Sequence, residues 1–194
     1  MDRWPALRDY VALIRAWSPR LDLVGSADVD RLEDRHVADS LRALPLLRSA
    51  GRGPAADVGS GAGFPGVVLA IAEPHRRWHL IERRRARAAF LEEVVRTLGL
   101  DNCRVVTKSA EDAARDPDLA GAHRVAVARA VASPARSFAL LEPLVGAGGV
   151  SLVYVGRGGD LPAQAEAYGD GLAIIRHART GPREGEPRRE DAQT

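Results

Sequence analysis

Residues 55–66 read Ala-Ala-Asp-Val-Gly-Ser-Gly-Ala-Gly-Phe-Pro-Gly, and this stretch decides the fold class. Its first four residues form a short, mostly apolar run typical of a strand, and the segment from Gly66 to Ala72 has a helical pattern. The glycines between them allow positive φ angles and let a ligand approach the backbone closely, while Pro65 suits the start of a helix. The stretch therefore predicts a strand, a tight turn and a helix whose N-terminus can cradle a ligand.

From Pro54 onward, short apolar runs alternate with helical patterns. The predicted elements are, in order, strand 55–58, helix 66–72, strand 78–81, helix 86–98, strand 104–107, strand 125–128, a helix beginning at Ser133-Pro134, strand 150–155, helix 161–168 and strand 172–176. Serine followed by proline is a recognised start of a helix. The alternation predicts an α/β fold, namely a Rossmann-like, mostly parallel sheet with helices on both faces.

The segment before this alternation is helical in pattern, with predicted helices over residues 4–17 and 29–47. We expect residues 1–50 to form a helical extension packed on one domain made of residues 51–178. A chain of 194 residues with 45% hydrophobic content suits one domain of this kind. Residues 179–194 are rich in Gly, Pro, Arg and Glu, so we expect a disordered tail.

The second predicted strand is followed by Glu82, 25 positions after Asp57. A carboxylate at this place can accept hydrogen bonds from the ribose hydroxyls of a bound nucleoside. The spacing Gly61-x-Gly63-x-x-Gly66 also satisfies the dinucleotide fingerprint, so a small NAD-binding oxidoreductase is one alternative.

Two observations favour S-adenosyl-L-methionine over NAD. Asp57 could orient the cationic amino-acid half of that cofactor, whereas it would repel a pyrophosphate. The chain also has no room for the sizeable substrate domain that a dehydrogenase normally needs. The pattern therefore predicts Asp57, Gly61, Gly63 and Glu82 as cofactor-binding residues.

The composition excludes several kinds of protein and of site. A single cysteine, Cys103, excludes a disulfide framework and a cysteine-based zinc site, and we interpret none of the scattered histidines as a metal ligand. No window approaches the roughly 18 apolar residues of a membrane span, and the first residues carry no export signal, so we expect a cytoplasmic protein. We also expect a monomer. The net charge is +2, and the cations are arginines apart from Lys108. Arginine suits phosphate and base contacts, although this content alone does not establish a nucleic-acid partner.

Four segments, in this order, resemble one protein family. They are residues 21–24 with 35–41, residues 57–66, residues 80–83 with 87–91, and residues 129–133. The family is RsmG (GidB), bacterial methyltransferases that modify N7 of a guanine in 16S rRNA, and the resemblance spans about residues 4–155. It implies S-adenosyl-L-methionine as the cofactor and 16S rRNA or the small ribosomal subunit as the partner.

The resemblance also implies roles for individual residues. Cofactor contacts are implied in the turn at Gly59 and Phe64, and beside the adenine at Ala110 and Glu111, with Glu82 as the ribose acceptor. Arg129, after the fourth strand, is the candidate catalytic residue, facing both cofactor and substrate.

The chain departs from the family after its fifth strand. Where the family commonly has Lys-Gly, this chain has Val155-Gly156, and Arg157 is the candidate substrate-binding cation there. Residues 179–194 also offer no apolar last strand, so either residues 172–176 take its place or one sheet edge is bare. These departures leave open a second alternative, a diverged member that binds the cofactor without methylating rRNA.

Arg35 and His36 are further candidate substrate-binding residues. Helical spacing places Arg35 beside Asp39 and His36 beside Ser40, which makes one polar face. That face either contacts RNA or only ties the helix to the domain. Guanine N7 carries a lone pair and no proton, so a reaction there needs no general base, and none of the familiar nucleophile and base arrangements is required.

Overall fold

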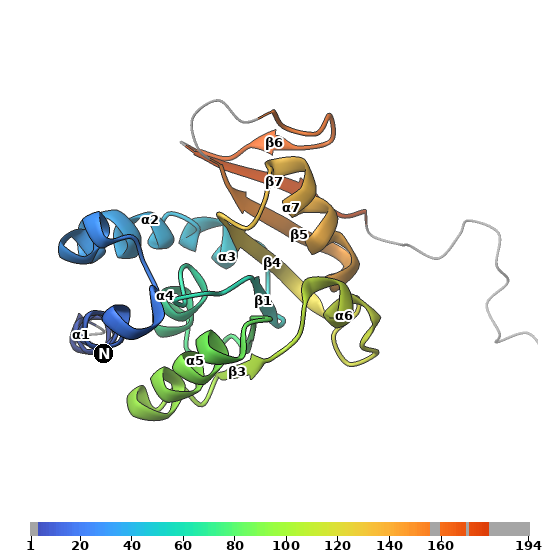
Figure 1. Ribbon diagram of the computed structural model, residues 1–194. Helices are drawn as coiled ribbons and strands as arrows, with labels where there is room; N and C mark the ends of the chain where they lie inside the picture. Colours follow the sequence, from blue (N-terminus) through green and yellow to red (C-terminus); the bar gives the residue numbers. More distant parts are fainter. Residues whose placement is uncertain (1–3, 156–159, 170, 179–194) are drawn as a thin grey trace, which may run out of the picture.

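The computed structural model describes residues 4–155, 160–169 and 171–178, and a seven-stranded sheet lies at their centre (Figure 1). The strands are β1 Ala55–Val58, β2 Trp78–Ile81, β3 Cys103–Val106, β4 His123–Arg129, β5 Val145–Tyr154, β6 Glu166–Ala167 and β7 Leu172–Arg176. The α-helices are α1 Trp4–Leu21, α2 Ala38–Leu41, α3 Leu44–Ser49, α4 Gly66–Ala72, α5 Arg85–Leu98, α6 Ala110–Arg115 and α7 Pro134–Leu141. Three further helical segments are the 3-10 helices η1 Ser26–Arg31 and η3 Glu142–Leu144 and the π-helix η2 Leu32–Val37.

The strand order is β3-β2-β1-β4-β5-β7-β6. Strands β1 to β5 pair in parallel, whereas β7 runs antiparallel to both β5 and β6. The predicted α/β fold with a mostly parallel sheet is therefore confirmed. The chain moves outward from β1 to β3 and then returns to β4, so the order reverses between β1 and β4. Ligands of open α/β sheets bind at such a point, beyond the carboxyl ends of the strands.

Side chains that alternate along the strands fill two core layers. On one face Trp78 packs in a cluster with Leu69 of α4 and Leu46 of α3. On the other face Ile81 packs with Phe138 and Leu141 of α7. Helices therefore cover both faces of the sheet, as Figure 1 shows for α4 and α7.

The N-terminal helix extends the first of these layers. Its buried residues include Leu7 and Ile14, and the Trp17 ring lies 5.8 Å from that of Phe90 in α5. The division of the chain at residue 50 stays a prediction, and the predicted tail 179–194 lies outside the described residues.

The predicted single helix over 29–47 is wrong, because the chain there forms η1, η2, α2 and α3 in succession. One cause is Pro45, which has no N–H to donate and whose ring would collide with the carbonyl four residues earlier. A helix can restart with proline in its first turn, and α3 does so at Leu44. The π-helical turn that contains Arg35 and His36 sets their directions differently from a regular helix.

The predicted helix over 161–168 is also wrong. This stretch leads through a turn into β6, whose two residues pair with β7. Tertiary pairing decides the matter, since extended backbone at Glu166 and Ala167 satisfies hydrogen bonds along the edge of β7. Strand β7 runs antiparallel beside β5, so residues 172–176 form a strand of the sheet, as predicted.

One short helix, α6, was not predicted. Its N-cap is Ser109, whose Oγ accepts a hydrogen bond from the amide of Asp112 at 3.0 Å. A serine at this position is a local start signal for a helix, but the helix has no apolar periodicity by which it could be predicted. This helix places Ala110 and Glu111 in the lining of a cavity of about 330 Å³.

A half-buried histidine of β2, His79, contacts a buried histidine of β4, His123. His79 Nδ1 and His123 Nε2 lie 2.7 Å apart, and His123 Nδ1 lies 2.9 Å from the carbonyl oxygen of Leu144. Burial, and then the neighbouring His123, lowers the pKa of His79 to about 4. Burial also lowers the pKa of His123. The folded protein therefore holds both rings neutral at pH 7.

We expect the free energy of unfolding to fall as the pH drops from about 6.5 to about 4. Over this range the histidines of the unfolded chain become protonated, whereas those of the folded pair stay neutral. After allowance for partial solvent access, we expect His79 to account for about 2 kcal/mol of the loss in the free energy of unfolding. Chemical denaturation at a series of pH values measures this, and His79→Asn should flatten the curve relative to wild type. The exposed His75→Gln is the control, and a His79→Asn curve parallel to that of wild type would contradict the expectation.

Candidate active site

The turn after β1 depends on glycine at two positions for close packing. Gly59 has a φ of +70°, and a Cβ atom there would lie 2.7 Å from Cγ2 of Val131. At Gly66, the first residue of α4, a Cβ atom would collide with the carboxylate of Asp57. Because Gly59 and Gly66 have no side chain, the turn can pack closely against Val131, after β4, and against the carboxylate of Asp57.

Glu82, directly after β2, is held against this turn. Its Oε2 accepts a hydrogen bond from the Gly61 amide at 2.9 Å, and its Oε1 accepts one from the Arg84 amide at 2.8 Å. Each carboxylate oxygen can accept two hydrogen bonds, so capacity remains for hydroxyl groups of a ligand. The side chain is buried, yet it lines a cavity of about 330 Å³.

This cavity lies beyond the carboxyl ends of β1, β2 and β4, as the fold predicts. Four of the predicted cofactor-binding residues line it, namely Gly59, Glu82, Ala110 and Glu111. Cations surround its mouth, because Arg83, Arg84, Arg87, Lys108 and Arg136 also belong to its lining. The cavity combines one buried carboxylate with a basic rim.

Asp57 is placed differently from the sequence prediction. Its carboxylate is fully buried, and Oδ2 accepts a hydrogen bond from the Gly66 amide at 3.0 Å. Asp57 is not among the residues that line the cavity. Burial raises its pKa to about 6, although the neighbouring Ser60 hydroxyl and the hydrogen bond from the Gly66 amide act in the opposite direction. Its role as a direct cofactor ligand stays a prediction, and in the structure it stabilises the start of α4.

Arg129, the last residue of β4, forms hydrogen bonds with two polar residues of the N-terminal segment, Asp39 and His36. Its Nη1 donates to Asp39 Oδ2 at 3.2 Å, and its Nη2 donates to His36 Nδ1 at 3.0 Å. The guanidinium carbon lies 5.1 Å from the centroid of the Phe64 ring, a cation–π contact. Residues predicted from three separate segments therefore meet at one place.

His36 is fixed as the neutral tautomer. Its ring stacks on Phe64 at a centroid distance of 5.0 Å, and because a guanidinium only donates, Nδ1 must be the acceptor. Burial, followed by the charge of Arg129, lowers the pKa of His36, while Asp28 raises it. The proton on Nε2 faces Asp28, whose Oδ2 lies 3.6 Å away.

Two hollows adjoin the cavity on the side of Arg129. One, of about 760 Å³, is lined by residues that include Arg35, His36 and Arg129, and the other, of about 320 Å³, by Arg129 and Tyr154 among others. Ala130 lines the cavity and both hollows, and its φ of +54° is unusual for a residue with a side chain. A cofactor and a substrate could thus approach this segment from opposite sides.

The remaining predicted residues lie around this centre. Gly61, Gly63 and Phe64 are buried within the turn and do not line the cavity. Arg35 Nη1 pairs with Asp28 Oδ1 at 2.9 Å. Arg157 lies outside the described residues.

Tyr10 is a site residue that the sequence reasoning missed. It lies on the buried face of α1, and its hydroxyl donates to the Ala62 carbonyl in the turn at 2.7 Å. Its ring centroid is 5.3 Å from that of Phe64. A tyrosine on an apolar helix face carries no local signal for such a contact, because only the fold brings α1 to the turn.

We expect Tyr10→Phe to lower the free energy of unfolding by about 1–2 kcal/mol, since the Ala62 carbonyl loses a buried donor. The loosened turn should weaken S-adenosylhomocysteine binding about fivefold, a loss of about 1 kcal/mol. Tyr154→Phe is the matched control. The Tyr154 hydroxyl also donates to a buried carbonyl, that of Ser40, at 2.7 Å, but this hydrogen bond does not involve the turn. Equal effects of the two variants on ligand affinity, measured by calorimetry, would contradict this role for Tyr10.

Residues 4–155, 160–169 and 171–178 contain no group of three or more His, Cys, Asp or Glu side chains placed to hold a metal ion. Within the same ranges no helix has the length and apolarity needed to cross a membrane.

Comparison with known proteins identifies the family. The family model for GidB, rRNA small subunit methyltransferase G, matches residues 3–165. The ribosomal RNA small subunit methyltransferase G of Acidiphilium cryptum (strain JF-5) is 41% identical over 165 residues, which cover 84% of this chain and 73% of that protein. The protein of the same name from Clavibacter sepedonicus is 37% identical over 175 residues, which cover 90% of this chain and 78% of that protein.

Solved structures support the fold. A hypothetical protein of Thermus thermophilus superposes with a TM-score of 0.58 at 24% identity, covering 75% of this chain and 87% of that chain. The proposed methyltransferase yhhF of Escherichia coli superposes with a TM-score of 0.53 at 20% identity, covering 74% of this chain and 85% of that chain. The family match spans both the turn with Glu82 and the residues around Arg129, and this chain belongs to the rRNA small subunit methyltransferase G (GidB) family.

Proposed function

We propose that this chain transfers a methyl group from S-adenosyl-L-methionine to N7 of a guanine in 16S rRNA. The observation that carries the proposal is the joint placement of Glu82 in a cavity at the turn and of Arg129 in the hollows next to it. Family membership supports the same reaction, since the relatives are named rRNA methyltransferases.

The residues present fit the cofactor. A volume of about 330 Å³ lies within the usual range of ligand cavities, roughly 300–1,000 Å³. Glu82 would accept hydrogen bonds from the ribose hydroxyls, while Gly59 would leave room close to the backbone and Ala110 with Glu111 would flank the adenine. When bound, the cofactor supplies an electrophilic methyl group on a positively charged sulfur.

The task of the protein's own residues is positioning. Guanine N7 needs no deprotonation, so orientation and proximity must supply most of the acceleration, an effect worth roughly 7–11 kcal/mol in favourable cases. Arg129 is suited to this, because Asp39, His36 and Phe64 hold its guanidinium in one orientation. Its remaining N–H donors can bind an anionic group, either the cofactor carboxylate or an RNA phosphate.

The substrate guanine must leave its stack to reach the site, which is easiest in a single-stranded loop. Arg35, Arg42 and Arg129 line the larger hollow together with Asp34 and Asp39. This excess of arginine is compatible with an RNA strand passing over the hollow.

The experiment is methyl transfer from labelled cofactor to small ribosomal subunits and to naked 16S rRNA, with N7-methylguanine mapped in the product. Transfer to one guanine is the expected result. Calorimetry that shows S-adenosylhomocysteine binding without transfer to either RNA would contradict the proposal and support a diverged member. Displacement of the cofactor by NAD at similar concentrations would contradict the choice of cofactor.

A further inference from the structure

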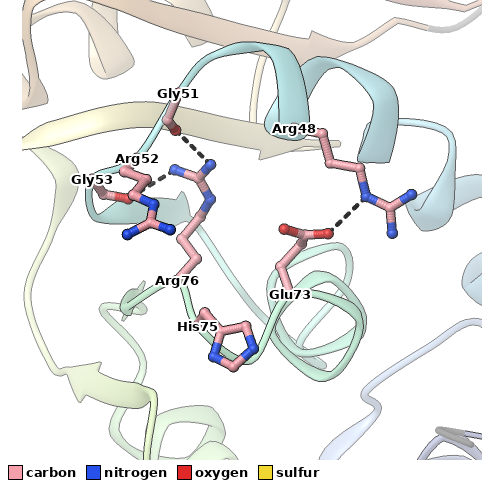
Figure 2. Close-up of a pocket in the computed structure, with 7 residues that line it drawn as sticks. All are labelled: Arg48, Gly51, Arg52, Gly53, Glu73, His75 and Arg76. Carbon is pink, nitrogen blue, oxygen red and sulfur yellow. Dashed lines mark hydrogen bonds and ion pairs between the residues drawn. The ribbon is translucent and has the colours of Figure 1, made fainter. Parts of the chain in front are cut away.

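A hollow of about 590 Å³ lies away from the proposed active site (Figure 2). It is formed by the end of α3, the linker at residues 51–53 and the turn between α4 and β2, and it is lined by Arg48, Gly51, Arg52, Gly53, Glu73, His75 and Arg76. The linker precedes β1 and the turn precedes β2, so the hollow lies at the amino ends of these strands. The cavity beside Glu82 lies at their carboxyl ends.

Arg76 is a buried cation at the floor of this hollow, with only 9% of its surface exposed. It donates to three carbonyl oxygens, those of Leu47 at 2.8 Å, Gly51 at 2.8 Å and Gly53 at 2.7 Å. Figure 2 shows the side chain reaching between Gly51 and Gly53. No carboxylate pairs with it within the described part of the chain, and its buried Nε has no hydrogen-bond partner there.

A structural role explains only part of this arrangement. The three hydrogen bonds connect the linker to the turn, but the carbonyl groups that accept them carry no net charge. Burying a charge is costly unless an opposite charge compensates it. Burial accordingly lowers the pKa of Arg76, whereas the nearby Glu73 raises it. The site still lacks an anion.

The other lining residues increase the positive charge. The carboxylate of Glu73 is bound by Arg48, whose Nε lies 2.9 Å from Oε1. Arg52 is exposed and has no ion pair among the described residues, and His75, which lines the same hollow, is also exposed. Three arginines and one carboxylate give the lining a formal excess of two positive charges. Arg124, which donates to the Ala50 carbonyl, adds a further cation behind the linker.

We infer that this hollow binds a phosphate group of the RNA substrate, as a second contact remote from the reacting base; the inference rests on the proposed function. Strand β1 has four residues, so its two ends are only about 13 Å apart. An RNA that presents a loop at the carboxyl ends can therefore reach the hollow with a neighbouring segment. Phosphate contacts of this kind position a nucleic acid without reading its sequence.

The test uses the full chain and naked 16S rRNA, with binding measured over a range of salt concentrations. Arg52→Ala should weaken RNA binding about threefold to tenfold and reduce the slope of log affinity against log salt by about 0.7–0.9, the value for one phosphate contact. Glu73→Gln removes the carboxylate and should strengthen binding about twofold to threefold. Arg115→Ala is the matched control, because Arg115 is exposed on α6 and pairs only with its helical neighbour Asp112 among the described residues.

Three outcomes separate the possibilities. Loss of affinity and slope in Arg52→Ala, with S-adenosylhomocysteine binding unchanged, supports the inference. Affinity and slope equal to those of Arg115→Ala overturn it. Stabilisation of the wild type by millimolar inorganic phosphate that Arg52→Ala abolishes, with RNA binding unchanged, also overturns it and assigns the hollow to free phosphate. Because RNA binding is measured without methyl transfer, failure of the proposed reaction is distinguishable from failure of this site.

Discussion

Glu82→Gln is expected to weaken binding of S-adenosylhomocysteine about 100-fold. The amide keeps the size of the side chain but loses the charge that strengthens hydrogen bonds from ribose hydroxyls. Two such bonds to a charged acceptor are each worth about 1.5–3 kcal/mol, and a net loss near 3 kcal/mol is about a factor of 100. Titration calorimetry measures the affinity, and circular dichroism confirms that the variant is folded, because Glu82 also accepts from Gly61 and Arg84.

Glu111→Gln is the matched control for this effect. Glu111 lines the same cavity but is exposed and pairs with Arg136 at 3.0 Å, so its loss should change the affinity less than about threefold. A Glu82→Gln variant that binds within threefold of wild type would show that Glu82 does not hold the ligand. In that case the main reason for assigning the cavity to the cofactor would be lost.

Arg129→Ala is expected to lower kcat/KM for the RNA about 1,000-fold, a loss of about 4 kcal/mol in transition-state stabilisation. Removing the guanidinium takes a cation away from the reacting groups, frees His36 and leaves Asp39 paired with Arg42 alone. Arg129→Lys should not restore the rate, because an ammonium group cannot donate to both partners in the planar geometry of the fork. Steady-state kinetics with separate determination of cofactor affinity measures the effect.

Arg42→Ala serves as the comparison, since Arg42 also binds Asp39, at 2.7 Å to Oδ1, but does not contact His36 or Phe64 in the described structure. We expect it to lower kcat/KM less than about fivefold, in the range of an exposed ion pair. Equal effects of the two alanine variants would contradict the special position of Arg129. A fall in cofactor affinity as large as the fall in kcat/KM would assign Arg129 to cofactor binding alone.

The sequence predicted the parts of the site that local chemistry determines. The turn between Val58 and Gly66 and the carboxylate of Glu82 could be identified because a strand, small residues and an acid follow one another at a spacing that parallel sheets require. The structure places Gly59 and Glu82 in one cavity. Asp57 could not be placed in this way, because its direction depends on α4, which packs so closely at Gly66 that the carboxylate caps the helix instead of lining the cavity.

The N-terminal segment shows the opposite case. Its apolar spacing predicted helices but not their breaks, since Pro45 and the π-helical turn at Leu32–Val37 interrupt the pattern. The same spacing could not show that Tyr10 would bind the Ala62 carbonyl, or that Asp39 and His36 would hold Arg129. These partners are 52 to 93 positions apart in the chain.

The sequence by itself determined strands β1 to β5 and β7, helices α4, α5 and α7, the position of the glycine-rich turn and the carboxylate after β2, because backbone preference and side-chain periodicity act over short distances. Only the tertiary structure decided the rest. It brought α1 to the turn, Arg129 between His36 and Asp39, and the uncompensated cation of Arg76 to the opposite end of the sheet. Such contacts depend on where distant elements pack, and no local pattern encodes them.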